Sequence, residues 1–137
     1  MIRMIILQGL PGSGKSTWAR EFVTGKKDWV IVNRDSLRNM RGDYWIPEQE
    51  KLITQWEEFC IKSAIEEGLN VIIDATNLNH KTLQRWYNRY KLYDIHPEMH
   101  FFDIPVEECI KRDAEREKPV GKDVIMRMYN SYFKGDN

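Results

Sequence analysis

The sequence is poor in cysteine and has no pattern of metal-binding residues. Its two cysteines, Cys60 and Cys109, stand far apart and outside any CxxC pair. Two distant thiols predict neither a zinc site nor a disulfide, so both are expected to pack as small hydrophobic side chains. The three histidines, His80, His96 and His100, also lack the spacing of a metal site.

An excess of charge of either sign is absent as well. Lys+Arg and Asp+Glu each number 21, so the formal net charge is zero. A surface that coats nucleic acid usually carries a basic excess. Any nucleic-acid contact of this chain should therefore be local, such as a pocket that holds the end of a strand. With 42% hydrophobic residues, the chain has enough apolar material for one core, and disorder is not expected.

Long hydrophobic runs are missing too. The apolar start, Met1–Leu10, is interrupted by Arg3 and continues into a glycine-rich loop. It is too short for a membrane span and lacks the layout of a signal peptide. We therefore expect a cytoplasmic protein without a membrane partner. The length of 137 residues corresponds to one domain, with no repeat or linker.

Predicted strands and helices alternate along the chain. Short apolar segments predict four strands, at Met4–Gln8, Trp29–Val32, Val71–Ile73 and Met99–Ile104. Apolar spacing and terminating residues predict helices from Lys15 to Gly25, after Asp35, and over Pro47–Glu67, His80–Leu92, Val106–Arg116 and Asp123–Phe133. This order predicts an α/β fold with a mainly parallel four-stranded sheet flanked by helices. Ligands of such sheets bind beyond the carboxyl ends of the strands.

Residues 9–16, Gly-Leu-Pro-Gly-Ser-Gly-Lys-Ser, match the phosphate-loop pattern GxxxxGK[ST] at every position. The match follows a predicted strand and precedes a predicted helix, as the motif requires. This context argues against a glycine-rich turn that matches by chance. Lys15 is predicted to reach the β and γ phosphates of ATP, and the Ser16 hydroxyl to bind Mg²⁺. The predicted ATP contacts of this segment are Gly9, Pro11, Gly12, Ser13, Gly14, Lys15, Ser16 and Thr17.

The segment Asn33–Arg38 follows the second strand. Transfer of a phosphoryl group to an alcohol needs a carboxylate that orients the hydroxyl and accepts its proton. Asp35 is the candidate, and Arg38, one helical turn later, is suited to hold a phosphate of the acceptor. Aspartate is also a favoured helix N-cap, and exposed arginines are common, so the spacing alone leaves both interpretations open.

A second polar segment, Asp74–Asn77, ends the third strand. Asp74 is suited to hold Mg²⁺ through water, and Thr76 and Asn77 to hydrogen-bond the acceptor or Asp35. The alternative is a turn that only leads into the next helix. The apolar strand before Asp74 and its expected place beside the phosphate loop favour a functional role.

A charged run, Lys111–Lys118, precedes a loop that contains Pro119 and Gly121. Most such runs are solvated helix faces. The loop also indicates a small lid, and a lid arginine can neutralise charge on a transferred phosphoryl group. The residues by themselves leave both interpretations open.

Aromatic residues at helical spacing are expected in the core, as is Phe59 on the predicted inward stripe of the long helix. Tyr44 and Trp45 fall in a predicted loop, where a nucleobase could stack. Packing is the favoured interpretation for these two residues as well.

Taken together, these motifs resemble the kinase domain of the bacteriophage 5′-polynucleotide kinase–phosphatase family. The resemblance covers nearly the whole chain, and the combination of the phosphate loop with NRDxxR and DxTN is far more specific than the loop alone. It is carried by Gly9–Trp18, Ala19–Phe22, Asn33–Asp35 with Arg38, Thr76–Asn79, Phe102–Pro105, and Lys111–Arg112 with Arg116.

The resemblance implies transfer of the ATP γ-phosphate to the 5′-hydroxyl of DNA or RNA, in repair of nucleic-acid ends. Asp35 would then be the general base, and Arg38 would hold the phosphate next to the acceptor nucleoside. Arg116 would contact the donor phosphates and stabilise the transition state, and Arg112 would pack on the nucleotide. We expect residues 1–137 to form a single P-loop kinase domain with a small helical lid.

The sequence departs from the family pattern in two ways. The phage enzyme carries a C-terminal phosphatase domain, which this chain does not contain. Its strand-three acid also stands one residue nearer to the Thr-Asn pair than Asp74 does. The proposed metal role of Asp74 is therefore inferred from its own position rather than from the family.

Two other functions remain compatible with the motifs. A kinase of a small-molecule alcohol would use the same donor site with a closed acceptor pocket. A P-loop NTPase that drives a partner would hydrolyse ATP without an acceptor. The pairing of Asp35 with Arg38 argues against the latter, because hydrolysis needs no clamp for an acceptor phosphate.

Overall fold

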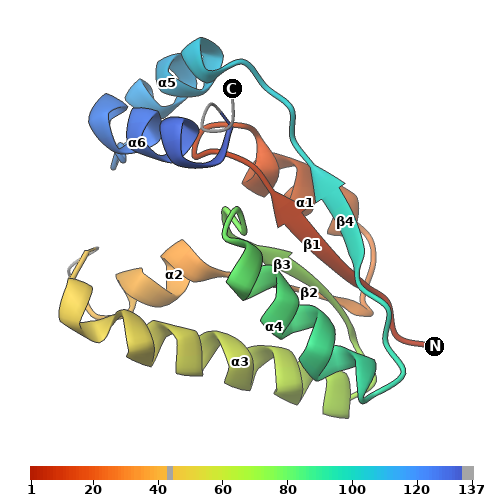
Figure 1. Ribbon diagram of the computed structural model, residues 1–137. Coiled ribbons are helices and arrows are strands. Elements are labelled where there is room, and N and C mark those ends of the chain that lie inside the picture. Colours follow the sequence, from red (N-terminus) through yellow and green to blue (C-terminus); the bar gives the residue numbers. More distant parts are fainter. Residues whose placement is uncertain (43–44, 134–137) are drawn as a thin grey trace.

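Four parallel strands form one sheet in the computed structural model, which describes residues 1–42 and 45–133 (Figure 1). The strand order is β2-β3-β1-β4, as expected for an α/β fold of βαβ units. The elements are β1 (Met4–Gln8), α1 (Lys15–Val23), β2 (Trp29–Asn33), α2 (Arg34–Asn39), the 3₁₀ turn η1 (Pro47–Gln49), α3 (Glu50–Glu66), β3 (Asn70–Asp74), α4 (His80–Lys91), β4 (Glu98–Phe101), α5 (Val106–Ala114) and α6 (Lys122–Tyr132).

The two central strands, β1 and β3, are covered on both faces. Ile6 and Ile73 pack with apolar residues of α3 and α4, while Ile5 and Ile72 pack on the opposite face with α1. Because alternate strand residues point to opposite faces, these strands are apolar at nearly every position. The continuous apolar runs that predicted them therefore reflect burial on both sides.

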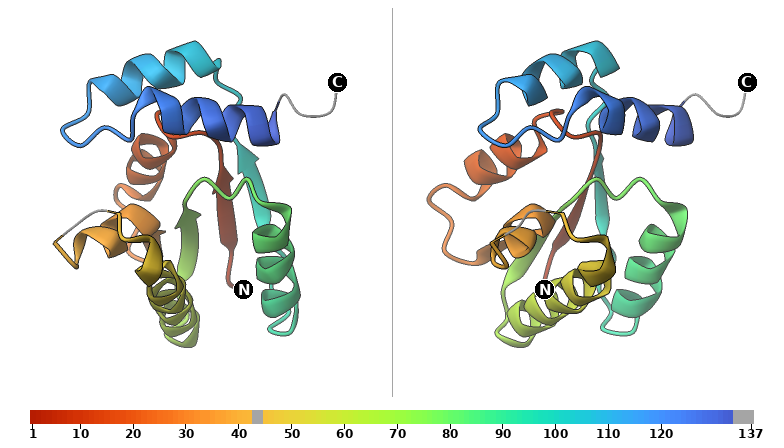
Figure 2. Two further views of the ribbon diagram at one scale, coloured as in Figure 1. Left: turned by 60° about the vertical axis from the view of Figure 1, so that its left-hand side comes forward. Right: turned by 90° about the vertical axis from the view of Figure 1, so that its left-hand side faces the viewer.

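The helices α5 and α6 form a separate layer beyond the carboxyl ends of the strands (Figure 2). Their shared cluster includes Cys109 and Ile125, which are fully buried, and extends to Leu10 of the phosphate loop and Leu78 after β3. This layer lies where a lid is expected, against the loop that carries the predicted phosphate site.

Several predicted boundaries and some predicted core positions were wrong. The fourth strand is Glu98–Phe101 rather than Met99–Ile104, because the chain turns away at Asp103 towards α5. The first turn of the predicted Pro47–Glu67 helix is a 3₁₀ turn, Pro47–Gln49, and the α-helix begins at Glu50. Phe59 is 71% exposed, so the inward stripe of α3 is narrower than its apolar residues indicate.

Both cysteines are free, and they pack as predicted. Cys109 is fully buried, and Cys60 packs against the cluster formed by α3 and α4. Within the described part of the chain, no group of three or more His, Cys, Asp or Glu residues could hold a metal ion alone. The helices of the same residues include none that is long and apolar enough to cross a membrane.

Candidate active site

The phosphate loop is held in its conformation by glycines and by contact with α5. Gly12 and Gly14 have φ angles of 82° and 93°, a region that side chains with a Cβ disfavour. A Cβ on Gly12 would lie 2.3 Å from the carbonyl oxygen of Cys109 in α5. Helix α1 begins directly after the loop, at Lys15, and its N-terminus therefore faces the concave side of the loop.

Lys15 is folded into this loop. Its ammonium Nζ donates to the carbonyl oxygens of Gly9 at 3.0 Å and Leu10 at 2.8 Å, and the residue is 8% exposed. Burial lowers the pKa of Lys15 to about 8, although the charges of Asp74 and Asp35 act in the opposite direction. Both carboxylates therefore lie near enough to act electrostatically on the ammonium group.

Ser16, Asp74 and Asn33 form a hydrogen-bonded cluster beside Lys15. The Ser16 hydroxyl donates to Asp74 Oδ2 at 2.7 Å, and Asn33 Nδ2 donates to the same oxygen at 2.7 Å. Asp74 is 3% exposed and faces Asn33 across the β2–β3 pairing. The third strand thus brings its acid to the phosphate loop, as predicted.

This cluster fits a magnesium site that uses phosphate oxygens as further ligands. Mg²⁺ prefers hard oxygen ligands and often takes only one or two from the protein. A hydroxyl at 2.7 Å from a buried carboxylate, next to the phosphate loop, provides them. Ser16 would bind the ion directly, and Asp74 would hold it through water.

Asn33, and not Asp35, caps helix α2. The Asn33 side chain accepts a hydrogen bond from the Ser36 backbone N–H at 2.8 Å, while Asp35 lies in the first turn. The alternative in which Asp35 serves as the N-cap was therefore wrong. Because Asn33 does the capping, the Asp35 carboxylate contacts arginine side chains instead, one on α2 and one after α5.

Asp35 lies between two arginines. Its Oδ1 accepts from Arg38 Nη1 at 2.7 Å, and its Oδ2 lies 4.0 Å from Arg116 Nη2. Arg38 is its neighbour on α2, whereas Arg116 follows α5, so α2 and the segment after α5 meet at this carboxylate. Its side chain is 36% exposed and remains accessible to a hydroxyl group.

Arg38 is also held by Glu50, the first residue of α3. The guanidinium donates through Nε to Oε2 at 3.0 Å and through Nη2 to Oε1 at 2.6 Å. Burial raises the pKa of Glu50, but the hydrogen bonds and charge of Arg38 outweigh it and leave the pKa below its usual value. A two-point contact with a carboxylate is the geometry in which arginine also binds phosphate.

Trp45 lies beside the same arginine. The Arg38 guanidinium carbon is 5.5 Å from the Trp45 ring centroid, and Trp45 is 58% exposed. The expectation that Trp45 packs in the interior was therefore wrong. Tyr44, its predicted companion, lies outside the described residues.

The charged run forms the end of α5 and the lid loop. Arg116 Nη1 lies 3.3 Å from Oδ1 of Asp113, whose two oxygens also accept the backbone N–H groups of Val120 and Gly121 at 2.9 Å each. Asp113 is 1% exposed, so one buried carboxylate ties both ends of the loop and orients Arg116. Arg112 stands beside the phosphate loop, with Nη1 3.5 Å from the Cβ position of Gly14.

Asn77 and Thr76 both join the loop after β3 to neighbouring segments. Asn77 is 5% exposed, and its Nδ2 donates to the carbonyl oxygen of Leu7 at 2.7 Å. Thr76 contributes its backbone carbonyl, which accepts from the Gly9 N–H at 3.0 Å. In this conformation, the Asn77 amide is used to join β1 to the loop after β3, not to hold Asp35.

A buried ion pair between Arg34 and Glu57 connects α2 to α3. Arg34 Nη1 donates to Glu57 Oε1 at 2.9 Å, and Glu57 is 2% exposed. Arg34 Nη2 also donates to Thr54 Oγ1 at 3.0 Å. Burial raises the pKa of Glu57, which the charge of Arg34 partly offsets. The pair joins the helix of Asp35 to the middle of α3.

Sequence reasoning missed four residues of this arrangement: Asn33 as the cap, Glu50, Glu57 and Asp113. Asn33 and Asp113 had a visible signal, since each stands three residues from the backbone N–H or arginine that it contacts. Glu50 and Glu57 had none, because a glutamate on a helix is ordinary until the fold reveals its partner.

The chain is similar to known proteins along most of its length. A family model described as an AAA domain matches residues 4–134. The chain is 27% identical to the putative bifunctional polynucleotide kinase/RNA ligase of Autographa californica nuclear polyhedrosis virus, over 98% of this chain and 21% of the viral protein. It is 30% identical to the L-seryl-tRNA(Sec) kinase of Methanococcus maripaludis, over 94% of this chain and 52% of that kinase.

A solved structure of the Pnkp1/Rnl/Hen1 RNA repair complex contains a similar chain. The TM-score is 0.82 at 36% identity, over 96% of this chain and 44% of that chain. The chain thus spans between about a fifth and about half of the length of these three relatives.

Proposed function

Because this chain belongs to the AAA domain family and has the fold of a P-loop kinase, we propose that it is a polynucleotide 5′-hydroxyl kinase. It would transfer the γ-phosphate of ATP to the 5′-OH end of DNA or RNA, in the repair of nucleic-acid ends. The observation that supports this most directly is the position of Asp35, which contacts Arg38 and lies 4.0 Å from Arg116, while its charge acts on Lys15.

The donor half of the reaction uses the phosphate loop. The loop N–H groups and Lys15 bind the β and γ phosphates, for which Lys15 exchanges its bonds to the loop carbonyls. When bound at Ser16 and Asp74, Mg²⁺ supplies positive charge to the same phosphates. Arg112 covers the nucleotide from α5, where it already stands beside Gly14.

The acceptor half uses α2. Asp35 accepts the proton of the 5′-hydroxyl while that oxygen attacks the γ-phosphorus, and ADP leaves on the opposite side. Arg38 binds the phosphate that follows the terminal nucleoside. This phosphate replaces Glu50 as the two-point partner of Arg38. Arg116 lies beside Asp35 and stabilises the negative charge on the transferred group.

The test is a panel of hydroxyl acceptors with γ-labelled ATP. We expect label at the 5′-OH ends of DNA and RNA oligonucleotides. Free nucleosides and sugars, which lack the phosphate for Arg38, should remain poor acceptors. Good ATP binding without transfer to any 5′ end would refute the proposal.

One alternative acceptor has a specific observation in its favour. The similarity to a seryl-tRNA kinase, at 30% identity over 94% of this chain, concerns an alcohol that is not a strand end. The panel should therefore include seryl-tRNA beside the small-molecule alcohols. Label on one of these acceptors, with 5′-OH strands unlabelled, would support a kinase of another alcohol.

A further inference from the structure

A basic stripe on α4 takes no part in the site described above. A shallow hollow of about 550 Å³ lies along this helix and is lined by Lys81, Gln84, Arg85, Asn88, Arg89 and Leu92. Lys81, Arg85 and Arg89 follow one another at intervals of four residues, so they lie on one side of the helix, about 6 Å apart along its axis.

The stripe begins near the carboxyl end of β3, beside the phosphate loop. Helix α4 starts at His80, shortly after β3 ends at Asp74 beside the phosphate loop. Lys81 is therefore the basic residue of the stripe nearest to the crevice, and Arg89 lies about 12 Å further along the helix. A ligand that leaves the crevice along α4 would meet the three cations in turn.

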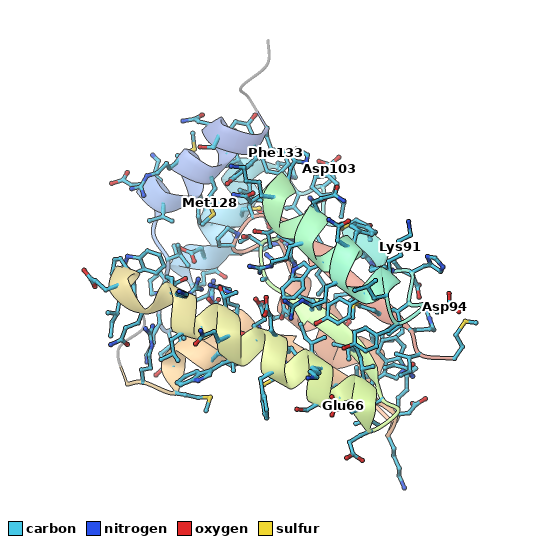
Figure 3. The ribbon with its side chains drawn as sticks, turned by 60° about the horizontal axis from the view of Figure 1, so that its bottom comes forward. Glu66, Lys91, Asp94, Asp103, Met128 and Phe133 are labelled. Carbon is cyan, nitrogen blue, oxygen red and sulfur yellow. The ribbon has the colours of Figure 1, made fainter. Side chains whose placement is uncertain are left out.

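Contacts with α3, the helix that also contacts Arg38, hold two residues of the stripe in place. Arg85 Nε and Arg89 Nη1 lie 3.6 Å and 3.1 Å from the carboxylate of Glu58 on α3. At its N-terminus, the same α3 presents Glu50 to Arg38. Figure 3 shows α3 and α4 on one face of the molecule, with Glu66 and Lys91 marking their C-terminal ends.

The composition of the stripe suits a phosphodiester backbone. Two of its three cations, Arg85 and Arg89, share one carboxylate, Glu58, so the stripe keeps a net positive charge in a chain whose formal net charge is zero. Gln84 and Asn88, which are hydrogen-bonded to each other at 2.8 Å, add neutral polar groups. The Arg85 guanidinium carbon lies 4.8 Å from the ring centroid of Trp86, which restrains it.

We propose that this stripe of Lys81, Arg85 and Arg89 binds the phosphodiester backbone of the acceptor strand beyond its terminal nucleotide. The inference rests on the proposed function and extends it: the acceptor is a strand of several nucleotides rather than a terminal nucleotide alone. Phosphate contacts of this kind add affinity without reading sequence and are sensitive to salt.

The experiment compares two acceptors of different length that share the same 5′-OH end. One is a nucleoside 3′-monophosphate, which reaches only Asp35 and Arg38, and the other is a 12-nucleotide single strand, as DNA and as RNA. In the double variant Lys81→Ala/Arg89→Ala, we expect the KM for the strand to rise about tenfold, with the KM for the mononucleotide and for ATP unchanged.

Salt dependence and charge restoration give two further readouts. The slope of log KM against log salt for the strand should fall by about 1.4, since each lost phosphate contact on a single strand contributes about 0.7. Glu58→Gln removes the carboxylate that faces Arg85 and Arg89, so it should lower the KM for the strand and leave the mononucleotide unaffected.

The matched control is Lys26→Ala/Lys27→Ala, which removes two exposed charges from the turn before β2, at the opposite edge of the sheet. It should change neither KM. Equal KM values for the strand in the wild type, the stripe variant and the control would overturn the inference while leaving the proposed function intact. A wild-type protein that labels neither the mononucleotide nor the strand would overturn both.

Discussion

Two aspartates at neighbouring strand ends have different partners and therefore different chemistry. Asp74 is buried and accepts from Ser16 and Asn33, which suits a fixed role next to a metal ion. Asp35 is partly exposed and lies between Arg38 and Arg116, which suits contact with a substrate that arrives from solution. At the scale of single residues, these surroundings distinguish the aspartate proposed for the metal site from the aspartate proposed as the base.

Asp35→Asn tests the base. The amide keeps the shape of the side chain but cannot accept the hydroxyl proton, so turnover should fall by about 10²–10⁴ while the KM for ATP stays within about twofold. Steady-state transfer to a 5′-OH strand measures both values. Asp94→Asn, at a carboxylate that is 93% exposed, is the control and should leave turnover unchanged. Full activity of Asp35→Asn would exclude Asp35 as the base.

Lys15 predicts a pH dependence of ATP binding. Its pKa of about 8 in the free protein means that the ammonium is charged below that pH and becomes neutral above it. The KM for ATP should therefore be constant from about pH 6.5 to 7.5 and rise above about pH 8, because a neutral amine attracts phosphate less.

Higher pH should stabilise the free protein, although it should weaken ATP binding. The pKa of Lys15 is 10.5 in an unperturbed chain and lower in the fold, so between the two values the unfolded chain binds more protons. The free energy of unfolding should thus rise with pH across this window. Denaturant unfolding with Lys15→Met as reference isolates the effect; the same pH slope in both proteins would contradict it.

At the scale of elements, the phosphate loop and the lid form one unit. Gly12 lies against the backbone of α5 at Cys109, and Arg112 on the same helix stands beside Gly14. Asp113, also on α5, holds the lid loop and Arg116. Displacement of α5 would therefore affect donor binding and the position of Arg116 together.

Gly12→Ala tests this contact. The new methyl group would lie 2.3 Å from the Cys109 carbonyl oxygen, so the loop or α5 must shift, and the KM for ATP should rise at least tenfold. Gly25→Ala is a matched control, because its φ is 78° but no atom lies within 4 Å of its Cβ position. The control should cost about 1–2 kcal/mol of stability and leave ATP binding unchanged. Equal effects of both variants on ATP binding would rule out the steric contact as the cause.

At the scale of the whole molecule, a buried ion pair joins α2, the helix of the proposed base, to the main core. Arg34 precedes Asp35 on α2, and its partner Glu57 lies on the inner side of α3, next to residues that pack on the sheet. Such a pair contributes little net stability when intact, but removal of one partner leaves a buried charge without compensation. The position of Asp35 is therefore linked to the stability of the α3 layer.

Glu57→Ala should destabilise the protein by about 2–4 kcal/mol. The loss is limited to this range because Arg34 keeps its contacts with Thr54 and Glu50. Chemical denaturation measures the change. Glu66→Ala removes an exposed pair with Lys62, whose atoms are 3.9 Å apart, and should cost less than about 1 kcal/mol. A loss for Glu57→Ala as small as that of the control would show that the buried pair does not support α2.

Much of the fold and part of the site could be predicted from local patterns. The four strands, the parallel sheet and the phosphate loop depend on neighbouring residues, such as the apolar run before Gly9 and the lysine that follows Gly14. Boundaries were less accurate where an end depends on distant packing, as at Phe101. The predicted burial of Phe59 was wrong because apolar spacing does not reveal which part of α3 packs against the sheet.

The sequence by itself determined the phosphate loop, the alternation of strands and helices, and the presence of one polar segment after each of three strands. These depend on local backbone preferences and on burial along single elements. Only the tertiary structure decided that Asn33 donates to Asp74, that Glu50 holds Arg38, and that Asp35 lies 4.0 Å from Arg116. Those partners come from different elements, and side chains distant in sequence acquire their roles only when the packing of the sheet, α3 and α5 brings them within a few ångströms.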